Sequence, residues 1–322
     1  MPRQLFVFIQ FEFPWALGPP DGRYLTRREG EQEPERVVVL ETLTATRGQH
    51  AAAAGAGGSP LRRLRGRPRT LPTDGEPVPA PTTRVTVIDP ISLSAEKQAR
   101  AWLEELDGER EVTAAAVVVN RVVHAHRIAA ADPYVHEVSP SQALVIRAGW
   151  GEGEQVADGR WLHARALPWA AQTHGVGRSR RRPRRDRSWA LRPQERLAAL
   201  LGARARGTAL LCEEFTLRAR QDLDQGHSQH AALELESAYA LAIAELEAEQ
   251  RQDLAIRLAE LRRLQSGVQA QAQAAAQAAQ ARAGAQAGNA EHVDALDEDA
   301  LTHALERLEA ALRARTAAGV GG

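Results

Sequence analysis

Short runs of apolar residues predict several β-strands in the N-terminal half of the chain. Residues 5–13 (LFVFIQFEF) are apolar on both faces at first and then alternate with Gln10 and Glu12, as in an interior strand that reaches an edge. Because this run needs cover on both sides, we expect it to share one sheet with other strands. Further β-branched runs predict strands at 23–27, 36–44, 84–89 and 144–150.

The dipeptide Asp21-Gly22 is a strong signal for a hairpin turn and predicts a meander of the first three strands. The pattern Asp-Gly-Arg-aromatic-Leu occurs at 21–25 and again at 158–162, each time after an apolar strand. A duplicated hairpin would explain this repeat. That Asp-Gly-Arg is simply a favourable turn sequence explains it equally well, so both interpretations stay open.

Helical spacing also occurs in this half. A helix is predicted from 94 to about 106, capped by Ser92 or Ser94. Residues 112–131 combine a β-branched run with the length and alanine content of a helix; we favour a helix, and a strand remains the alternative. Residues 139–142 match a capping box with proline at the first helical position, which predicts a single turn.

The C-terminal part of the chain is helical in its spacing. Helices are expected at 193–201, 208–223, 228–246, 253–264 and 297–314. The residues at 269–287 form an Ala/Gln tract that is helical by propensity but shows no apolar stripe to anchor it.

The last of these helices carries four leucines on one face: Leu301, Leu305, Leu308 and Leu312. An isolated helix of this length is marginal in water, so burial must supply its stability. We therefore expect the leucine stripe to dock either on the 228–264 helices of the same chain or on a protein partner.

Together these patterns predict an α+β fold: an N-terminal, mostly antiparallel sheet with packed helices, followed by an all-α C-terminal region. Residues 46–83 are rich in Ala, Gly, Arg and Pro and are expected to be disordered, because they offer little apolar surface to bury. The expected parts are a mixed α/β domain (1–45 and 84–170), a disordered linker or insertion (46–83), a basic linker (171–190), a helical domain (191–265), a low-complexity Ala/Gln tract (266–290) and a terminal amphipathic helix (291–316).

Composition narrows the cellular setting. The chain has 41 basic and 41 acidic residues, so no overall field attracts polyanions. A single cysteine, Cys212, fits a reducing compartment, and no apolar run is long enough to span a membrane. We expect a cytoplasmic protein without a cofactor. Lys97 is the sole lysine, so arginine is the default cation here and arginine clusters carry less meaning than usual.

One cluster of polar residues could form a ligand site. On a helix, Asn120, His124 and Arg127 fall on one stripe, with Asp132 just beyond it. A histidine there could serve a ligand or a proton transfer, and a solvated helix face is the alternative. We expect no metal site, because His124 and His126 point apart on a helix. The pair His227 and His230 shows no third ligand in the sequence.

No catalytic motif is present, and we predict no catalytic residue. The acidic neighbours Glu213 and Glu214 oppose a nucleophilic role for Cys212. The leading interpretation is therefore a non-catalytic protein-interaction or scaffold protein, acting through helices 228–264 and 297–314 with a partner or with itself. The alternatives are a DNA-associated protein and an enzyme or ligand-binding site around His124.

Two local resemblances bear on these alternatives. Arg65-Gly66-Arg67-Pro68 resembles the core of an AT-hook, which implies that Arg65 and Arg67 would enter the minor groove of AT-rich DNA. A second arginine run could neutralise phosphates without reading sequence. It consists of Arg180, Arg181, Arg182, Arg184 and Arg185.

The other resemblance covers 212–240. Gly226, Ala231, Leu235 and Ala238 resemble the second half of a tetratricopeptide repeat, with glycine in the turn and small and large residues alternating down the second helix. No second repeat follows, so an isolated helical hairpin is expected. The resemblance implies contact with another protein.

Overall fold

The computed structural model describes residues 4–27, 33–43, 82–156, 158, 161, 163–169, 193–202, 209–284 and 296–318. The chain divides into two compact units. The first comprises residues 1–23, 38–115 and 139–173, and the second comprises residues 24–37, 116–138 and 174–322.

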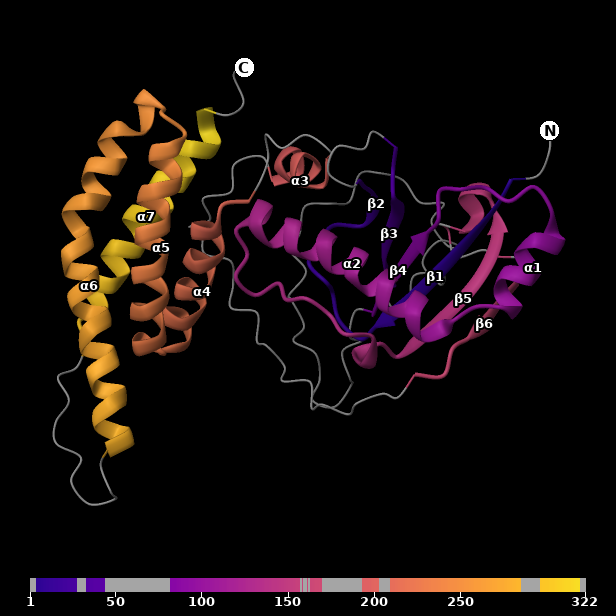
Figure 1. Cartoon of the computed structure of the whole chain (residues 1–322), viewed down its shortest axis with the longest axis horizontal. Helices are drawn as coiled ribbons and strands as arrows, with labels where there is room; N and C mark the ends of the chain where they lie inside the picture. The colour runs from indigo at the N-terminus through magenta and orange to yellow at the C-terminus, as the bar shows by residue number, and fades with distance from the viewer. Residues whose placement is uncertain are drawn as a thin grey trace, which may run out of the picture. The chain divides into compact units, whose positions relative to one another are not determined.

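An antiparallel six-stranded sheet organises the N-terminal part of the chain, with strand order β2-β3-β4-β1-β5-β6 (Figure 1). Its central strand β1 pairs with β4 on one side and β5 on the other, so that Phe8 lies opposite Ile88 and Gly149. The predicted α+β class is confirmed. The expectation that the strands predicted at 5–13, 36–44, 84–89 and 144–150 share one sheet is also confirmed. The strands are β1 (Leu5–Phe13), β2 (Gly22–Thr26), β3 (Arg36–Leu43), β4 (Thr82–Ile88), β5 (Val145–Glu152) and β6 (His163–Ala166).

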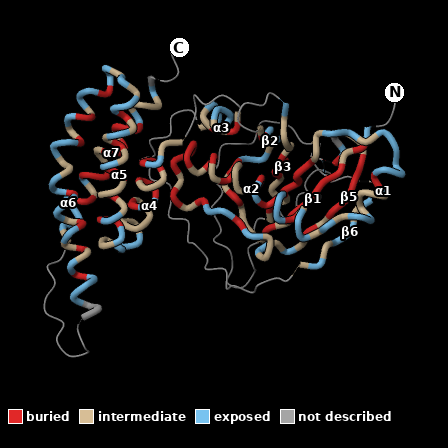
Figure 2. Tube along the Cα trace, in the orientation of Figure 1, coloured by how far each residue is buried: buried red, intermediate tan, exposed pale blue. Residues whose placement is uncertain are grey.

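The central position of β1 accounts for its composition. Leu5, Phe8, Phe11 and Phe13 are almost completely buried, as the run of red along this strand in Figure 2 shows. Gln10 is buried as well, and its amide donates a hydrogen bond of 3.0 Å to Thr86 Oγ1 on β4. Consecutive residues of β1 are buried, so both of its faces are covered, and a strand of this kind needs apolar residues on both faces.

The predicted meander of the first three strands is wrong, because β1 and β2 are not neighbours. Asp21 does not close a β1–β2 hairpin; its carboxylate accepts hydrogen bonds from Thr42 N (2.9 Å) and Thr42 Oγ1 (2.7 Å), at the end of β3. The duplicated hairpin fails for the same reason, since β5 and β6 do pair whereas β1 and β2 do not. Strand β4 begins at Thr82, two residues before the predicted start.

Helix α1 (Glu96–Glu104) packs on the sheet, as predicted. Its buried Ala99 and half-buried Trp102 and Leu103 contact a cluster that includes Leu5 and Trp150. The predicted serine cap is wrong: the N-cap is Ala95, which makes no side-chain hydrogen bond. The helix begins too late for Ser92 or Ser94 to reach its first free N–H groups.

Residues 112–130 belong to helix α2 (Gly108–Ala130). Of the two structures considered for residues 112–131, the favoured helix is therefore confirmed and the strand is wrong. After it, Ser139 and Gln142 form the predicted capping box around a single turn, Pro140–Gln142, in which Ser139 N donates to Gln142 Oε1 over 2.8 Å.

The helices predicted in the C-terminal part are present and belong to the second unit. They are α3 (Pro193–Leu201), α4 (Leu211–Gln225), α5 (Ser228–Ala248), α6 (Ala255–Gly284) and α7 (Glu298–Ala318). Helices α4 and α5 form a hairpin around Gly226, whose φ of +77° closes α4 in the left-handed conformation that glycine adopts without strain. Ala231, Leu235 and Ala238, which carry the tetratricopeptide resemblance, are fully buried.

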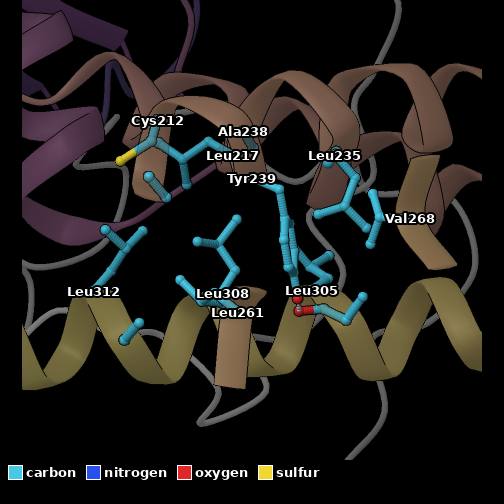
Figure 3. Close-up of a cluster of buried hydrophobic side chains, with 14 of the residues drawn as sticks. Cys212, Leu217, Leu235, Ala238, Tyr239, Leu261, Val268, Leu305, Leu308 and Leu312 are labelled. Carbon is cyan, nitrogen blue, oxygen red and sulfur yellow. Dashed lines mark hydrogen bonds between the residues drawn. The ribbon is translucent and has the colours of Figure 1, made fainter. Parts of the chain in front are cut away.

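The leucine stripe of α7 lies in the core of this unit. Leu301, Leu305, Leu308 and Leu312 are all buried and share one apolar cluster with α4, α5 and α6. Figure 3 shows Leu305, Leu308 and Leu312 of α7 pointing toward the helices that carry Cys212, Leu217 and Tyr239. The Tyr239 hydroxyl donates a hydrogen bond of 2.7 Å to Ala304 O on α7. Of the two docking surfaces considered, the stripe therefore occupies the one within its own chain.

The expectation that the Ala/Gln tract lacks an anchoring stripe is wrong. Helix α6 continues without a break through residues 265 and 266 to Gly284. Val268, Ala272, Ala275 and Ala278 are buried along one face of it. Small alanine side chains let neighbouring helices approach closely, so they bury a face that looks featureless in the sequence.

Within the described ranges, no helix is both long and apolar enough to cross a membrane. The predictions for residues 46–81 and 171–190 fall outside the part of the chain that the structure describes.

Candidate functional site

A polar hollow of about 320 Å³ opens in the second unit. The end of α2 supplies one wall, the segment after α2 a second, and the first half of α4 a third. Valines at 123 and 135 contribute to its lining. Its polar lining consists of His124, Arg127, His136, Glu137, Glu214 and Arg218.

An ion-pair network holds the hollow together. Arg127 Nη1 donates to Glu214 Oε1 over 2.6 Å, and Arg218 Nε donates to the same oxygen over 3.1 Å. The Arg127 and Glu214 side chains are 13% and 17% exposed, whereas that of Arg218 is 50% exposed. Glu214 therefore fixes a buried guanidinium and holds a second one at the mouth of the hollow.

Two polar atoms of this network have no hydrogen-bond partner. Arg127 Nε and Glu214 Oε2 are shielded from solvent, and neither has a hydrogen-bond partner. Buried polar atoms normally find partners, so unmet groups of this kind mark a place where an additional polar group can bind.

His136 faces the same hollow and has a lowered pKa. Desolvation in the hollow is the main cause, and the positive charge of Arg127 adds to it; Asp132 and Glu214 act in the opposite direction. Its imidazole is consequently neutral at neutral pH, with one N–H to donate and one nitrogen to accept.

The structure brings together two of the four residues predicted for a ligand site. His124 and Arg127 both line the hollow. Asn120 does not: its side-chain amide donates to Val138 O (2.9 Å) and accepts from Val138 N (2.8 Å). Asp132 accepts from Tyr134 N over 3.1 Å and so shapes the turn after α2.

Sequence reasoning missed the partners that complete the hollow. His136 and Glu137 follow the predicted stripe closely and could have been included as nearby polar residues. Glu214 and Arg218 lie on α4, at least 90 positions beyond His124, and nothing in the local pattern links them to that histidine. Their juxtaposition depends on how the segment after α2 meets the helices.

A second group of polar side chains meets at the turn between α4 and α5. One ligand atom each of Asp222, His227 and His230 lies within 4.8 Å of the others. Asp222 is thus the third candidate ligand that the sequence did not reveal beside the two histidines.

Cys212 is packed in the core and does not line the hollow. Burial is the main cause that raises the pKa of its thiol, and Glu245 and Glu213 add to it. A thiolate is therefore disfavoured, in agreement with the expectation from the sequence that Cys212 is not a nucleophile. The residues proposed for DNA contact, Arg65, Arg67, Arg180, Arg181, Arg182, Arg184 and Arg185, lie outside the described residues.

Comparison with known proteins identifies no relative: no protein-family model, no curated protein and no solved structure matches the chain significantly.

Proposed function

We propose that this protein binds a small ligand with an anionic group, a carboxylate or a phosphate, in the hollow of its second unit. One observation carries the proposal: two guanidinium groups and two imidazoles surround a single space of about 320 Å³. That volume is typical of small-molecule sites, in which a few convergent polar groups set the specificity.

The arginines are suited to an anion. A guanidinium offers a planar fork of N–H donors that matches carboxylate and phosphate oxygens. Glu214 engages one edge of Arg218 through Nε, and the half-exposed side chain keeps its other donors available at the mouth of the hollow.

The acidic residues narrow the ligand class. Glu137 and Glu214 line the same space, so the hollow is mixed in charge rather than uniformly basic. With two arginines and two glutamates, the lining has no net positive charge to attract a polyanion such as a nucleic-acid backbone, and it favours a compact ligand with one anionic group and further polar or cationic groups. Of the interpretations from sequence, this supports a ligand site around His124.

A protein partner on helices 228–264 is the second candidate function. Its original basis, the leucine stripe at 297–314, is occupied by the bundle itself. What supports it now is the exposure of two large apolar side chains in this region, Leu233 (41%) and Ile256 (79%).

The test is calorimetric titration of the full chain with three probes: inorganic phosphate, succinate and a free amino acid. We expect saturable one-to-one binding of at least one probe, weakened about tenfold by Arg218→Gln, because a hydrogen bond to a charged group contributes about 1.5–3 kcal/mol.

Arg262→Gln is the matched control. Arg262 is 48% exposed and ion-paired with Glu247 over 2.7 Å, but it does not line the hollow. The proposal fails if no probe binds, or if the two substitutions weaken binding equally.

A further inference from the structure

The turn between α4 and α5 gathers three side chains that commonly bind metal ions. Asp222 lies in the last turn of α4, His227 is the N-cap residue of α5, and His230 follows in the first turn of that helix. Asp222 Oδ1 lies 3.5 Å from His227 Nδ1, and the two imidazole centroids are 5.8 Å apart.

The backbone fixes this arrangement. The left-handed Gly226 reverses the chain, and His227 N then donates to Asp222 O over 2.8 Å. Ala231 N in turn donates to His227 O over 3.0 Å. The carboxylate that ends one helix and the imidazoles that open the next are therefore held on the same turn by main-chain hydrogen bonds.

The side chains retain the freedom needed to close around an ion. In a tetrahedral zinc site with bonds of 2.0–2.1 Å, ligand atoms lie about 3.4 Å apart. The three atoms here lie within 4.8 Å of one another, and the His227 side chain is 53% exposed. The ligand atoms must therefore approach one another by roughly 1.4 Å at most, and the exposed imidazoles have room to rotate.

Glu234 is a further carboxyl group that interacts electrostatically with Asp222 and His230. It lies one helical turn beyond His230 on α5, and its Oε2 atom is shielded from solvent without a hydrogen-bond partner. Burial is the main cause that raises the pKa of this carboxyl group, and the charges of Asp222 and Glu214 add to it, whereas Arg218 and His230 act in the opposite direction. A cation nearby would relieve that unfavourable environment.

We propose that Asp222, His227 and His230 form a binding site for a divalent transition-metal ion of the zinc type. Two imidazoles and one carboxylate are the nitrogen and oxygen donors that zinc accepts, whereas magnesium and calcium prefer oxygen ligands throughout. Three protein ligands leave one tetrahedral position for water or for an external ligand. The ion would also link α4 to α5 across their turn.

The experiment is calorimetric titration of the full-length, chelator-stripped chain with Zn²⁺, with Mg²⁺ as the comparison ion. We expect one Zn²⁺ per chain at this site and no Mg²⁺ binding. Co²⁺ should give a visible absorption band, which reports on the ligands without any activity assay.

Substitution separates this site from other histidines of the chain. Removing a group that merely supports a ligand lowers metal affinity about 10–100-fold, so His227→Gln and His230→Gln should each cost at least about tenfold. Asp222→Asn should also weaken binding. His303→Gln, at an exposed histidine of α7, is the matched control and should leave binding unchanged.

Circular dichroism should show that the variants keep the helical content of the parent chain, since His227 and His230 are exposed. The proposal is overturned if Zn²⁺ does not bind, or if folded His227→Gln and His230→Gln proteins bind it as tightly as the parent chain.

Discussion

At the scale of single residues, similar side chains on one helix serve different purposes. Asn120 and His124 lie on the same stripe of α2, and the sequence suggests one site for both. The amide of Asn120, however, satisfies the N–H and the C=O of Val138, eighteen residues further along. An amide carries one acceptor and one donor group, so it can replace the missing backbone partners of an irregular segment. Asn120 is therefore a structural residue.

This assignment predicts the effect of Asn120→Ala. The substitution leaves the buried Val138 without either partner, which should lower the free energy of unfolding by about 1–3 kcal/mol. Thr113→Ala, at an exposed position of the same helix, should change it little. Urea denaturation measures both. A variant that unfolds like the parent chain but loses ligand binding would instead place Asn120 in the hollow.

At the scale of elements, the sequence predicted the strands β1 to β5 but missed β6 (His163–Ala166), and it did not predict how the strands pair. Residues 5–13 are apolar on both faces, and this correctly indicated an interior strand. The neighbours of β1 are β4 and β5, which come much later in the chain. A turn signal such as Asp21-Gly22 shows where the chain changes direction, and it cannot show which strands then meet.

Helix α6 illustrates a different limit. Its buried residues 272, 275 and 278 have helical spacing, but so many alanines surround them that no stripe stands out. Hydrophobic patterning detects a contrast between faces. In this tract both faces of the helix carry alanines. Which alanines are buried depends on tertiary packing and not on residue type.

The packing of α6 predicts different effects on stability for substitutions at two alanines one helical turn apart. Ala275 is buried in the core of the bundle, so Ala275→Leu should overpack it and lower the free energy of unfolding by about 1–3 kcal/mol. Ala279 is exposed, and Ala279→Leu should have little effect. Thermal unfolding of the two variants compares them directly. Equal effects would mean that this tract does not pack against the bundle.

At the scale of the whole molecule, both the candidate site and the docking of α7 depend on contacts between segments far apart in the sequence. His124 and Arg127 were identified from their own helix, whereas Glu214 and Arg218 enter the hollow only through the fold. Likewise, the stripe of α7 showed that the helix must dock, but the sequence left open whether the surface was internal or external. An amphipathic face specifies that burial occurs and leaves the identity of the covering surface to the rest of the chain.

The internal docking of α7 predicts how leucine substitutions act. Leu305 is fully buried in the cluster formed with α4, α5 and α6, so Leu305→Ala removes buried methyl groups and leaves a cavity. The free energy of unfolding should fall by about 2–5 kcal/mol. Leu233→Ala, at a leucine of α5 that is 41% exposed, should cost much less. Leu305→Ala should leave the sedimentation coefficient of the native protein unchanged, because the stripe is buried within one chain. A contrary result would be a changed sedimentation coefficient for Leu305→Ala with an unchanged free energy of unfolding. The leucine stripe would then dock on another molecule and not on α4, α5 and α6.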